Sequence, residues 1–327
     1  MRKLRCGIMG PGKIAQNKIA TALARNKNVI LYAVGSKDLK KANDFAKEFG
    51  FEKAYGSYEE MVKDPNLDVV YIATLNSFHY ENIKLCLENN KHVICEKPFT
   101  INTKEAEEVI KLAEEKKLFL MEAMWSRFLP GTKKLKEVLC SGSVGKIKTL
   151  TVTLGFNNDI PRLIKREFGG GALLDLGVYI LHFIVGMLGA EIEEIKTIMI
   201  PTPTEVDGQA MISFRYKDGT IATAHCSITA DYTNEAVFYG DAGRIVVPRF
   251  SEVEIIKVFR NTVLEPTVYY VPYEGTGFEY QIKEAVDSIL SGRTEPDSLT
   301  HAETLAIMRL MDKIREIWDL KYPADIR

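Results

Sequence analysis

The sequence predicts an α/β domain with a doubly wound parallel sheet, followed by an α+β domain built on an open, largely antiparallel sheet. Strand and helix signals alternate from Lys3 to about Met124, whereas several strand candidates follow one another from Ile192 to Val271 without intervening helices. Alternation indicates parallel βαβ units with right-handed crossovers, and consecutive strands indicate antiparallel pairing. A chain of 327 residues also exceeds one typical core. We therefore expect domains over residues 1–124 and 125–327.

In the first half, apolar runs predict buried strands and amphipathic runs predict the helices between them. The clearest strand is Val69–Ala73, where apolar residues follow one another without interruption. Ser57-Tyr58-Glu59-Glu60 has the form of a capping box, which opens a short helix. The other expected elements are strands Lys3–Met9, Val29–Gly35, His92–Cys95 and Phe119–Glu122, and helices Lys13–Arg25, Leu39–Phe49, Tyr80–Asn89 and Thr103–Lys116.

In the second half, a helix near Lys133–Cys140 precedes an alternating strand over Lys148–Gly155. Three glycines, Gly169–Gly171, then open a helical run to about Leu188. Turns at Lys217–Gly219 and Asp241–Gly243 separate later strands, and two helices close the chain, Glu279–Leu290 and Ala302–Trp318.

Composition excludes several classes of protein. Hydrophobic residues make up 46% and charged residues 27%, and the net charge is −1, so bulk electrostatics draws the chain neither to nucleic acid nor to an anionic membrane. The five cysteines form no CxxC pair and are expected to be small core residues in a reducing compartment. The five histidines show no metal-ligand spacing, so no metal is expected. Without a signal-peptide pattern, and with Tyr179–Gly189 too short to span a bilayer, we expect a soluble cytoplasmic protein.

A glycine-rich turn follows the first strand. Its residues, Gly10-Pro11-Gly12-Lys13-Ile14-Ala15, fit the G-x-G-x-x-G/A pattern. Gly10 permits the tight turn, Gly12 lets the backbone approach a pyrophosphate, and Ala15 allows close helix–strand packing. The pattern alone is common, but its place between a strand and a helix is typical of a Rossmann dinucleotide site rather than of an ordinary turn.

The end of the second strand indicates which dinucleotide binds. NAD enzymes usually place an acid there to bind the ribose 2′-hydroxyl, but here the strand ends in Gly35-Ser36-Lys37, with Lys40 and Lys41 close behind. Ser36 can donate to a 2′-phosphate, and Lys37 can neutralise its charge. This favours NADP(H), with NAD(H) as the alternative. Asp38 weakens the signal, and a solvated helix start is the plainer interpretation of the lysines.

A charged pair and a proline follow another buried strand, in the run His92-Val93-Ile94-Cys95-Glu96-Lys97-Pro98. Ligands of open α/β sheets bind at the carboxyl ends of the strands, which places Lys97 well to meet a substrate. A surface Glu–Lys pair is the plainer interpretation.

Glu96-Lys97-Pro98 at this distance from the glycine turn resembles the glucose–fructose oxidoreductase, inositol dehydrogenase and MocA (Gfo/Idh/MocA) family, over essentially the whole chain. The runs from Phe119 to Pro130, from Gly169 to Tyr179 and from Lys321 to Asp325 are similar to the branch of dimeric dihydrodiol dehydrogenase and NADP-dependent xylose dehydrogenase. The resemblance implies an oxidoreductase acting on a sugar, polyol or cyclic diol. It also implies a homodimer or higher homo-oligomer formed through the C-terminal sheet.

The resemblance also implies residue roles. Lys97 matches the catalytic lysine, Asp175 matches the acid of a D-x-x-x-H motif, and Tyr179 replaces the histidine of that motif. The remaining matches are Arg162 and Glu96 near the cofactor, Thr74, Leu75, Asn76 and His79 beneath its riboses, and Trp125 at the substrate pocket.

The spacing of the second-domain residues agrees with these roles. Asp175, Tyr179 and His182 stand at i, i+4 and i+7, so a helix would place them on one face. Polar groups on an apolar helix are costly unless they meet water, each other or a ligand. His182 is a candidate substrate contact, although a satisfied core histidine is the plainer interpretation.

A mechanism follows as a hypothesis. A free tyrosine has a pKa of about 10, and a nearby ammonium favours the phenolate. Tyr179 would exchange the hydroxyl proton, Lys97 would assist it and bind the substrate oxygen, and Asp175 would orient Lys97 or a substrate hydroxyl. Lys97 as the acid/base itself is the alternative. Rival functions are NAD-dependent glycoside hydrolysis and a non-catalytic NADP(H) sensor.

Overall fold

The chain divides into two units in a computed structural model that describes residues 2–158 and 160–326. The first unit comprises Met1–Trp125 and Glu274–Met308, and the second comprises Ser126–Tyr273 and Arg309–Arg327. Residues 274–308 thus belong to the first unit, although they follow most of the second unit in the sequence. The expected domains, 1–124 and 125–327, were each continuous in the chain.

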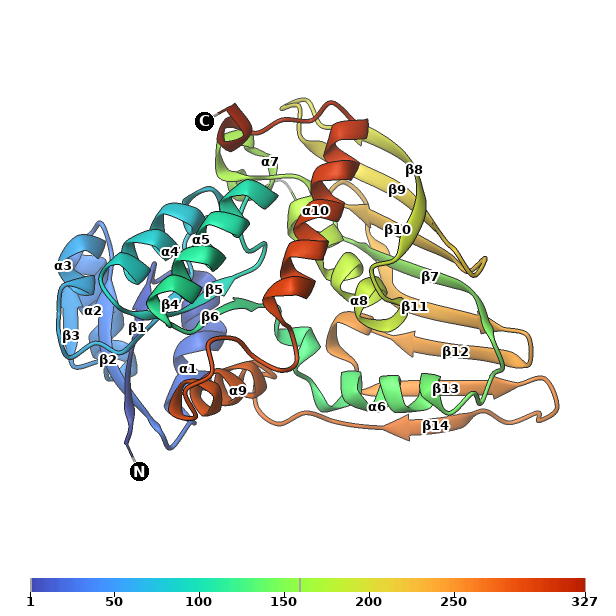
Figure 1. The fold of residues 1–327 in the computed structure, drawn as a ribbon, viewed down its shortest axis with the longest axis horizontal. Coiled ribbons are helices and arrows are strands. Elements are labelled where there is room, and N and C mark those ends of the chain that lie inside the picture. Colours follow the sequence, from blue (N-terminus) through green and yellow to red (C-terminus); the bar gives the residue numbers. More distant parts are fainter. Residues whose placement is uncertain (1, 159, 327) are drawn as a thin grey trace. The chain divides into compact units, whose positions relative to one another are not determined.

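A six-stranded parallel sheet in the order β3-β2-β1-β4-β5-β6 forms the centre of the first unit (Figure 1). This confirms the expected α/β fold. The strand order reverses between β1 and β4, and ligands of such sheets bind at the carboxyl ends beside that reversal. The strands are β1 (Leu4–Met9), β2 (Val29–Gly35), β3 (Lys53–Tyr55), β4 (Val69–Ile72), β5 (His92–Glu96) and β6 (Leu120–Ala123).

Helices connect these strands, and side chains cap three of them. Asp38, Ser57 and Asn102 each accept a hydrogen bond from a backbone N–H three residues later, so the helix start expected at Ser57 is confirmed. The helices are α1 (Ala20–Ala24), α2 (Leu39–Phe49), α3 (Tyr58–Val62), α4 (His79–Glu88), α5 (Thr103–Lys116) and α9 (Glu279–Leu290), with α10 (His301–Ile317) crossing from the first unit into the second. Shorter turns are η1 (Ala15–Ile19, π-helical), η2 (Asn76–Phe78) and η3 (Trp125–Arg127).

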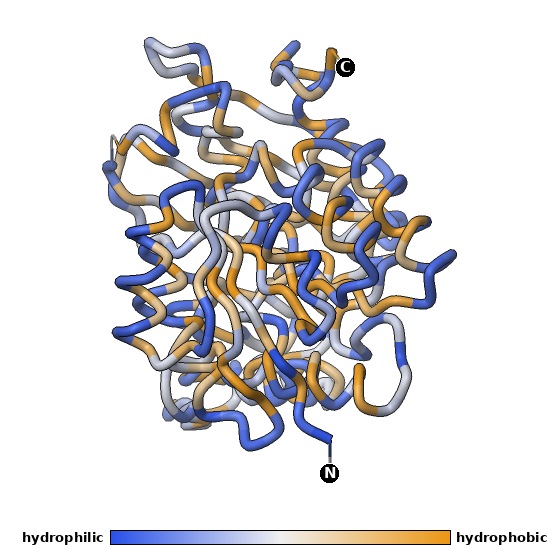
Figure 2. Tube along the Cα trace, turned by 90° about the vertical axis from the view of Figure 1, so that its left-hand side faces the viewer, coloured by the Kyte–Doolittle hydropathy of each residue, from blue (hydrophilic) through white to orange (hydrophobic). Residues whose placement is uncertain are grey.

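Burial explains why these segments form these elements. All four residues of β4 are buried, as expected for a central parallel strand covered on both faces. In the Cα trace of Figure 2, hydrophobic and hydrophilic residues alternate along the helical parts of the chain. One side of each helix therefore packs on the sheet and the other meets solvent.

The second unit contains an eight-stranded sheet in the order β14-β13-β12-β11-β7-β10-β9-β8 (Figure 1). Its neighbours pair antiparallel except β7 and β10, so the expected, largely antiparallel sheet is confirmed, with one parallel pair. The strands are β7 (Ile147–Gly155), β8 (Ile192–Pro201), β9 (Asp207–Tyr216), β10 (Ile221–Ser227), β11 (Tyr232–Gly240), β12 (Gly243–Pro248), β13 (Ile255–Arg260) and β14 (Thr267–Tyr270).

Helix α8 (Val178–Leu188) packs on β7 and β10, and α6 (Pro130–Cys140) packs on β13. The helical stretch Arg166–Leu188 is the one span among the described residues long and apolar enough to cross a membrane, but 78% of its most apolar window is buried inside the protein. It is therefore a core helix. The remaining turns are α7 (Pro161–Ile164), η4 (Arg166–Phe168), η5 (Leu173–Gly177, π-helical), η6 (Phe250–Glu252) and η7 (Pro323–Ile326).

Most differences from the expected elements are shifts of one residue at an end. The larger one is α6, which begins at Pro130 rather than Lys133, because a proline at the first helical position needs no hydrogen-bond acceptor for its nitrogen. Four cysteines are buried as expected, but Cys140 is exposed because it ends that surface helix.

Candidate active site

The turn of Gly10–Ala15 forms one side of the candidate site, at the carboxyl end of β1. Gly10 has a φ of +87°, and a Cβ added there would lie 2.9 Å from Thr74 Cγ2, so this position requires glycine. A Cβ added at Gly12 would meet nothing closer than 4.0 Å. No side chain caps the helix that follows. The N–H groups of Gly10 and Gly12 donate to Gly35 O and Gly10 O, so it is the open space at Gly12 and the helix start after it that fit the pyrophosphate of a dinucleotide.

At the carboxyl end of β2, the two residues expected to bind a 2′-phosphate differ in exposure. Ser36 is buried, and its hydroxyl accepts a hydrogen bond from Asp38 N over 3.2 Å, which leaves its own proton available. Lys37 is exposed, with its Nζ 5.1 Å from the centre of the Phe78 ring. Lys41 is exposed on α2, where its backbone N–H meets the capping carboxylate of Asp38.

His79 connects the loop after β4 to the loop after β5. Its ring nitrogens lie 3.2 Å from Thr74 O and 2.8 Å from Pro98 O. The histidine is completely buried, and this burial lowers its pKa although both carbonyl contacts act in the opposite direction. Thr74 is held a second time, because Asn82 Nδ2 donates to its hydroxyl over 3.0 Å. The side chain of His79 therefore supports the loop that carries Leu75 and Asn76, both of which are partly exposed.

Glu96 and Lys97 face different surroundings although they are neighbours. Glu96 is buried and accepts a hydrogen bond of 2.6 Å from the Tyr71 hydroxyl, to which Gln281 Nε2 donates in turn over 3.1 Å. Burial, followed by the Glu96 charge, raises the pKa of Tyr71 well above its ordinary value and keeps it a donor. Lys97 remains partly exposed. Glu96 thus anchors the end of β5 from inside, while Lys97 is the accessible member of the pair.

Trp125 lies two residues after the end of β6, at the start of η3. Its ring stacks on Phe278 with centroids 4.8 Å apart and planes 11° from parallel. The indole is 8% exposed, so only an edge of this aromatic pair is available to a ligand.

In the second unit, Asp175 and Tyr179 lie on consecutive helical segments. Asp175 belongs to the π-helical turn η5, and Tyr179 is the second residue of α8. π-helical turns inside α-helices occur frequently at functional sites. Asp175 is buried, and its Oδ1 accepts from Arg162 Nη1 over 2.7 Å. Tyr179 is partly exposed.

His182 is completely buried one turn after Tyr179. Its backbone carbonyl accepts a hydrogen bond of 3.3 Å from Arg127 Nη1. A ligand would have to open the core to reach this ring, so its burial favours the core interpretation over a substrate contact.

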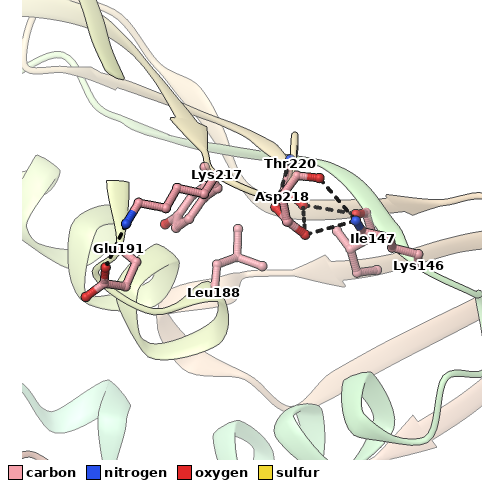
Figure 3. A pocket seen from close by; sticks show the side chains of 8 residues that line it. Lys146, Ile147, Leu188, Glu191, Lys217, Asp218 and Thr220 are labelled. Atoms are coloured by element: carbon pink, nitrogen blue, oxygen red, sulfur yellow. Dashed lines mark hydrogen bonds and ion pairs between the residues drawn. The ribbon is translucent and has the colours of Figure 1, made fainter. Parts of the chain in front are cut away.

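A pocket of about 310 Å³ in the second unit contains none of the expected site residues in its lining (Figure 3). It is lined by Lys146, Ile147, Leu188, Glu191, Tyr216, Lys217, Asp218 and Thr220. Its charges are already paired, with Lys146 Nζ 3.3 Å from Asp218 and Lys217 Nζ 3.9 Å from Glu191. Among the described residues, no group of three or more His, Cys, Asp or Glu is arranged to hold a metal ion.

Several supporting residues were not expected from the sequence. Tyr71 carried a detectable signal, because a tyrosine in a buried strand needs a partner for its hydroxyl. Phe78 lies between the expected loop residues Asn76 and His79, but nothing in its local sequence predicted its contact with Lys37. Gln281 carried no local signal, because only the fold brings it to the Tyr71 hydroxyl from a distant part of the chain.

Two family models match the chain. The model described as an oxidoreductase family with an NAD-binding Rossmann fold matches residues 4–124, and the model described as the GFO/IDH/MocA C-terminal domain matches residues 132–246. Trans-1,2-dihydrobenzene-1,2-diol dehydrogenase from Danio rerio is 31% identical over 98% of this chain and 99% of its own length. The enzyme of the same name from Mus musculus is 32% identical over 99% of each chain.

Solved structures share the fold. A 3-ketoreductase from Actinomadura kijaniata in complex with NADP and TDP-benzene superposes with a TM-score of 0.89 at 25% identity, covering 96% of this chain and 98% of the other. An aldose–aldose oxidoreductase from Caulobacter crescentus gives a TM-score of 0.87 at 22% identity, covering 96% and 97%.

Proposed function

The chain belongs to the GFO/IDH/MocA family of NAD(P)-dependent oxidoreductases, and from this premise we propose that it uses NADP(H) to interconvert an alcohol and a carbonyl on a sugar, polyol or cyclic diol. When bound, the nicotinamide takes the hydride with its two electrons from the alcohol carbon, or returns it in the reverse direction. The protein must orient that carbon and move the hydroxyl proton.

The observation that carries this proposal lies within the first unit. The nucleotide turn follows β1, Lys97 follows β5, and His79 joins the loop after β4 to Pro98, next to Lys97. The groups suited to a pyrophosphate and the cation suited to a substrate oxygen therefore stand on loops at the same edge of one sheet. That arrangement suits a substrate held beside a dinucleotide.

The proposed roles combine residues from both units. Lys97 donates a hydrogen bond to the substrate oxygen, and Tyr179 takes the hydroxyl proton during oxidation and returns it during reduction. Trp125, of which 8% is exposed, supplies a small apolar contact to the substrate ring. Asp175, which is paired with Arg162, orients Lys97 or a substrate hydroxyl. The action of Lys97 and Tyr179 on one substrate is part of the proposal.

NADP(H) is proposed over NAD(H) because no acid stands at the end of β2. Ser36 keeps a free hydroxyl proton, and Lys37 is an exposed cation at the same strand end. A hydroxyl and a cation suit a phosphate, whereas a carboxylate would suit a ribose hydroxyl. The similarity to a 3-ketoreductase crystallised with NADP supports the same choice.

The substrate class rests on the relatives and on the site. Relatives about a third identical over the full length are named as dehydrogenases of a cyclic diol. The aromatic side chain of Trp125 and the ammonium of Lys97 suit a ring that carries neighbouring hydroxyl groups. We therefore propose pentoses, hexoses and cyclic diols as the substrates to test first.

The test is a screen of aldoses and cyclic diols with NADP and NAD, followed by absorbance of the reduced cofactor. We expect turnover with NADP, and kcat losses of about 100-fold or more in both Tyr179→Phe and Lys97→Met. NADPH binding, measured by fluorescence, should survive in both variants. Near wild-type kcat in both would refute the assigned roles.

Solvent isotope effects then separate the two candidate proton donors. If Tyr179 moves the proton, the residual activity of Tyr179→Phe loses the solvent isotope effect that Lys97→Met retains. The opposite pattern assigns the proton to Lys97.

We also propose a homodimer formed through the uncovered face of the eight-stranded sheet. Ile198, Ile200, Met211, Ile221 and Tyr239 are exposed, and the strand registers place them all on this face. Several exposed apolar side chains on one sheet face, with polar residues between them, suit an interface between two copies. Met211→Glu combined with Ile198→Glu should convert the dimer to a monomer in light scattering. If the wild-type protein were a monomer in light scattering, the proposed dimer would be refuted. The cytoplasmic location stays a prediction.

A further inference from the structure

The C-terminal segment Lys321–Asp325, which the proposed reaction does not use, is packed in the second unit on the turn Gly169–Gly171. The Tyr322 hydroxyl donates to Gly170 O over 2.5 Å, and Arg166 Nε donates to Lys321 O over 2.6 Å. Tyr322 is 1% exposed. The segment thus holds the glycine turn at two points, at Arg166 just before it and at Gly170 within it.

A buried carboxyl group holds the same turn from the sheet side. Asp207, the first residue of β9, is 0% exposed, and its Oδ2 accepts from Leu173 N over 2.5 Å. A Cβ added at Gly171 would lie 2.0 Å from Asp207 Oδ1 and 3.0 Å from the Tyr322 hydroxyl. Both side chains therefore close around Gly171, whose φ of +117° also requires glycine.

This turn sets the start of the helix that carries the proposed catalytic groups. Gly171 N donates to Leu163 O over 2.7 Å, and Asp175 N donates to Gly171 O over 3.2 Å. Tyr179 follows four residues later on the same helical run. Because a helix continues the direction of its first turn, a shift of the turn moves Asp175 and Tyr179 with it.

The groups that face Asp207 come from three elements. Tyr322 belongs to the C-terminal segment, Arg315 to α10 and Cys226 to β10, and Arg315 is itself bound to Asp325 over 2.6 Å. The Tyr322 proton is engaged with Gly170, and Asp207 Oδ1 has no hydrogen-bond partner among the described residues. A neutral carboxyl group suits these surroundings, and burial raises the pKa of Asp207 to about 7.

We propose that Tyr322 and Asp207 are positioning residues for the proposed reaction, which clamp the Gly169–Gly171 turn and so fix the place of Asp175 and Tyr179. The inference rests on the proposed function, because it assigns catalysis to Tyr179. It also gives the C-terminal segment a role in the reaction, exerted through the helix without contact with the substrate.

The first test compares Tyr322→Phe with a matched control, Tyr216→Phe. Tyr216 is also a buried tyrosine of the second unit, and its hydroxyl donates to Gly189 O over 3.1 Å at the other end of α8. Tyr322→Phe should lower kcat about 10- to 100-fold, with the Kd for NADPH unchanged, because small misplacements of catalytic groups are costly. Tyr216→Phe should keep kcat within about twofold at a similar loss of Tm. Equal effects of the two variants on kcat would overturn the proposal.

The second test needs no activity, and so separates this inference from the proposed function. Amide hydrogen exchange of residues 169–179 should accelerate in Tyr322→Phe and stay at the wild-type rate in Tyr216→Phe. If the wild type turned over no sugar or diol, the proposed function would fail while this exchange pattern still supported the clamp. If the exchange of these residues were unchanged in Tyr322→Phe, the proposed positioning role of Tyr322 would be refuted even if the enzyme were active.

The third test exchanges the carboxyl group. Asp207→Asn keeps an oxygen that accepts from Leu173 N, so its kcat should stay within about threefold of wild type. Asp207→Ala removes this acceptor and should lower kcat and accelerate exchange as Tyr322→Phe does. If Asp207→Ala and Asp207→Asn both kept wild-type kcat and exchange, Asp207 would not position the helix.

Discussion

The Arg162 guanidinium donates to Asp175 Oδ1 over 2.7 Å, which ties a 44% exposed cation to a carboxylate that is 4% exposed. Both residues were expected to serve the site, Arg162 near the cofactor and Asp175 as an acid. Their pairing means that neither acts alone. A carboxylate this deeply buried is stable only while its charge and hydrogen bonds are satisfied.

We predict that Arg162 and Asp175 are energetically coupled. In a double-mutant cycle with Arg162→Gln and Asp175→Asn, the coupling in the free energy of unfolding should be about 1 kcal/mol, since solvent screens the exposed arginine. Arg166 and Glu205, which form a pair of 3.4 Å with the glutamate 81% exposed, are the matched control and should show almost no coupling. Urea unfolding of seven proteins, the wild type and three variants for each pair, measures both cycles. Equal coupling in the two cycles contradicts the prediction.

We predict that Lys37 selects the phosphorylated coenzyme. Lys37→Gln should raise the Kd for NADPH about 10- to 100-fold, because one charge-assisted hydrogen bond is lost, and leave the Kd for NADH within about twofold. Lys40→Gln is the control, since Lys40 is exposed and paired with Asp44 over 2.8 Å. Fluorescence titration of the wild type and both variants with NADPH and NADH gives the six dissociation constants. Loss of NADH affinity equal to that of NADPH would show that Lys37 does not recognise the phosphate.

We predict that Asp64 makes the first unit sensitive to acid. Burial alone would raise the pKa of Asp64, but hydrogen bonds from Lys53, Tyr55, Asn66 and Tyr32 outweigh it and hold this pKa well below its ordinary value. A depressed carboxyl pKa stabilises the fold above the unfolded value of about 3.9, and that stability is lost as the pH falls below it.

Asp64→Asn should therefore cost about 2–3 kcal/mol of unfolding free energy at pH 7 and about 1 kcal/mol less at pH 3, since the rest is lost only as the pH falls through the depressed folded pKa. The exposed Asp44→Asn serves as control and should change stability by less than about 0.5 kcal/mol at either pH. Urea unfolding of the wild type and both variants at pH 7 and pH 3 measures these changes in unfolding free energy. A cost for Asp64→Asn that is independent of pH contradicts the assigned ionisation.

We predict the opposite pH dependence for Asp207. Its pKa is raised to about 7 in the fold, so between about pH 4 and pH 7 the folded protein holds a proton that the unfolded chain has released. The unfolding free energy therefore falls as the pH rises through this window, by roughly 2–4 kcal/mol, and levels off above it. Asp207→Asn should lack this part of the slope in thermal melts between pH 5 and pH 8. Parallel slopes in variant and wild type would refute the shift.

The sequence predicted most of the fold because its periodic patterns were strong. The strand Val29–Gly35 and the helices Leu39–Phe49 and Thr103–Lys116 have the bounds expected from their apolar spacing and caps. The parallel pairing of β7 with β10 was not expected, because these strands are far apart in the chain and their local patterns carry no sign of direction. The return of residues 274–308 to the first unit was missed for the same reason.

For the site, local motifs located single residues but not their partners. The glycine turn and Lys97 could be placed because each follows a strand, and a strand's carboxyl end is where ligands bind. His79 was expected beneath the cofactor, yet its buried ring bridges two carbonyl groups, which only the folded backbone brings to it. Asp207 and Tyr322 carried no local mark of their contact with the turn at Gly169–Gly171.

By itself, the sequence determined which segments become strands and helices, which turn suits a pyrophosphate, and which residues bear reactive groups, since these depend on neighbours a few positions apart. The tertiary structure alone decided that Arg162 pairs with Asp175, that Tyr71 donates to Glu96 while Gln281 donates to Tyr71, and that the C-terminal segment holds the turn before Tyr179. The physical reason is burial. A polar group inside the protein must be paired, and its partner comes from whichever distant segment the packing of the core brings within a hydrogen bond of it.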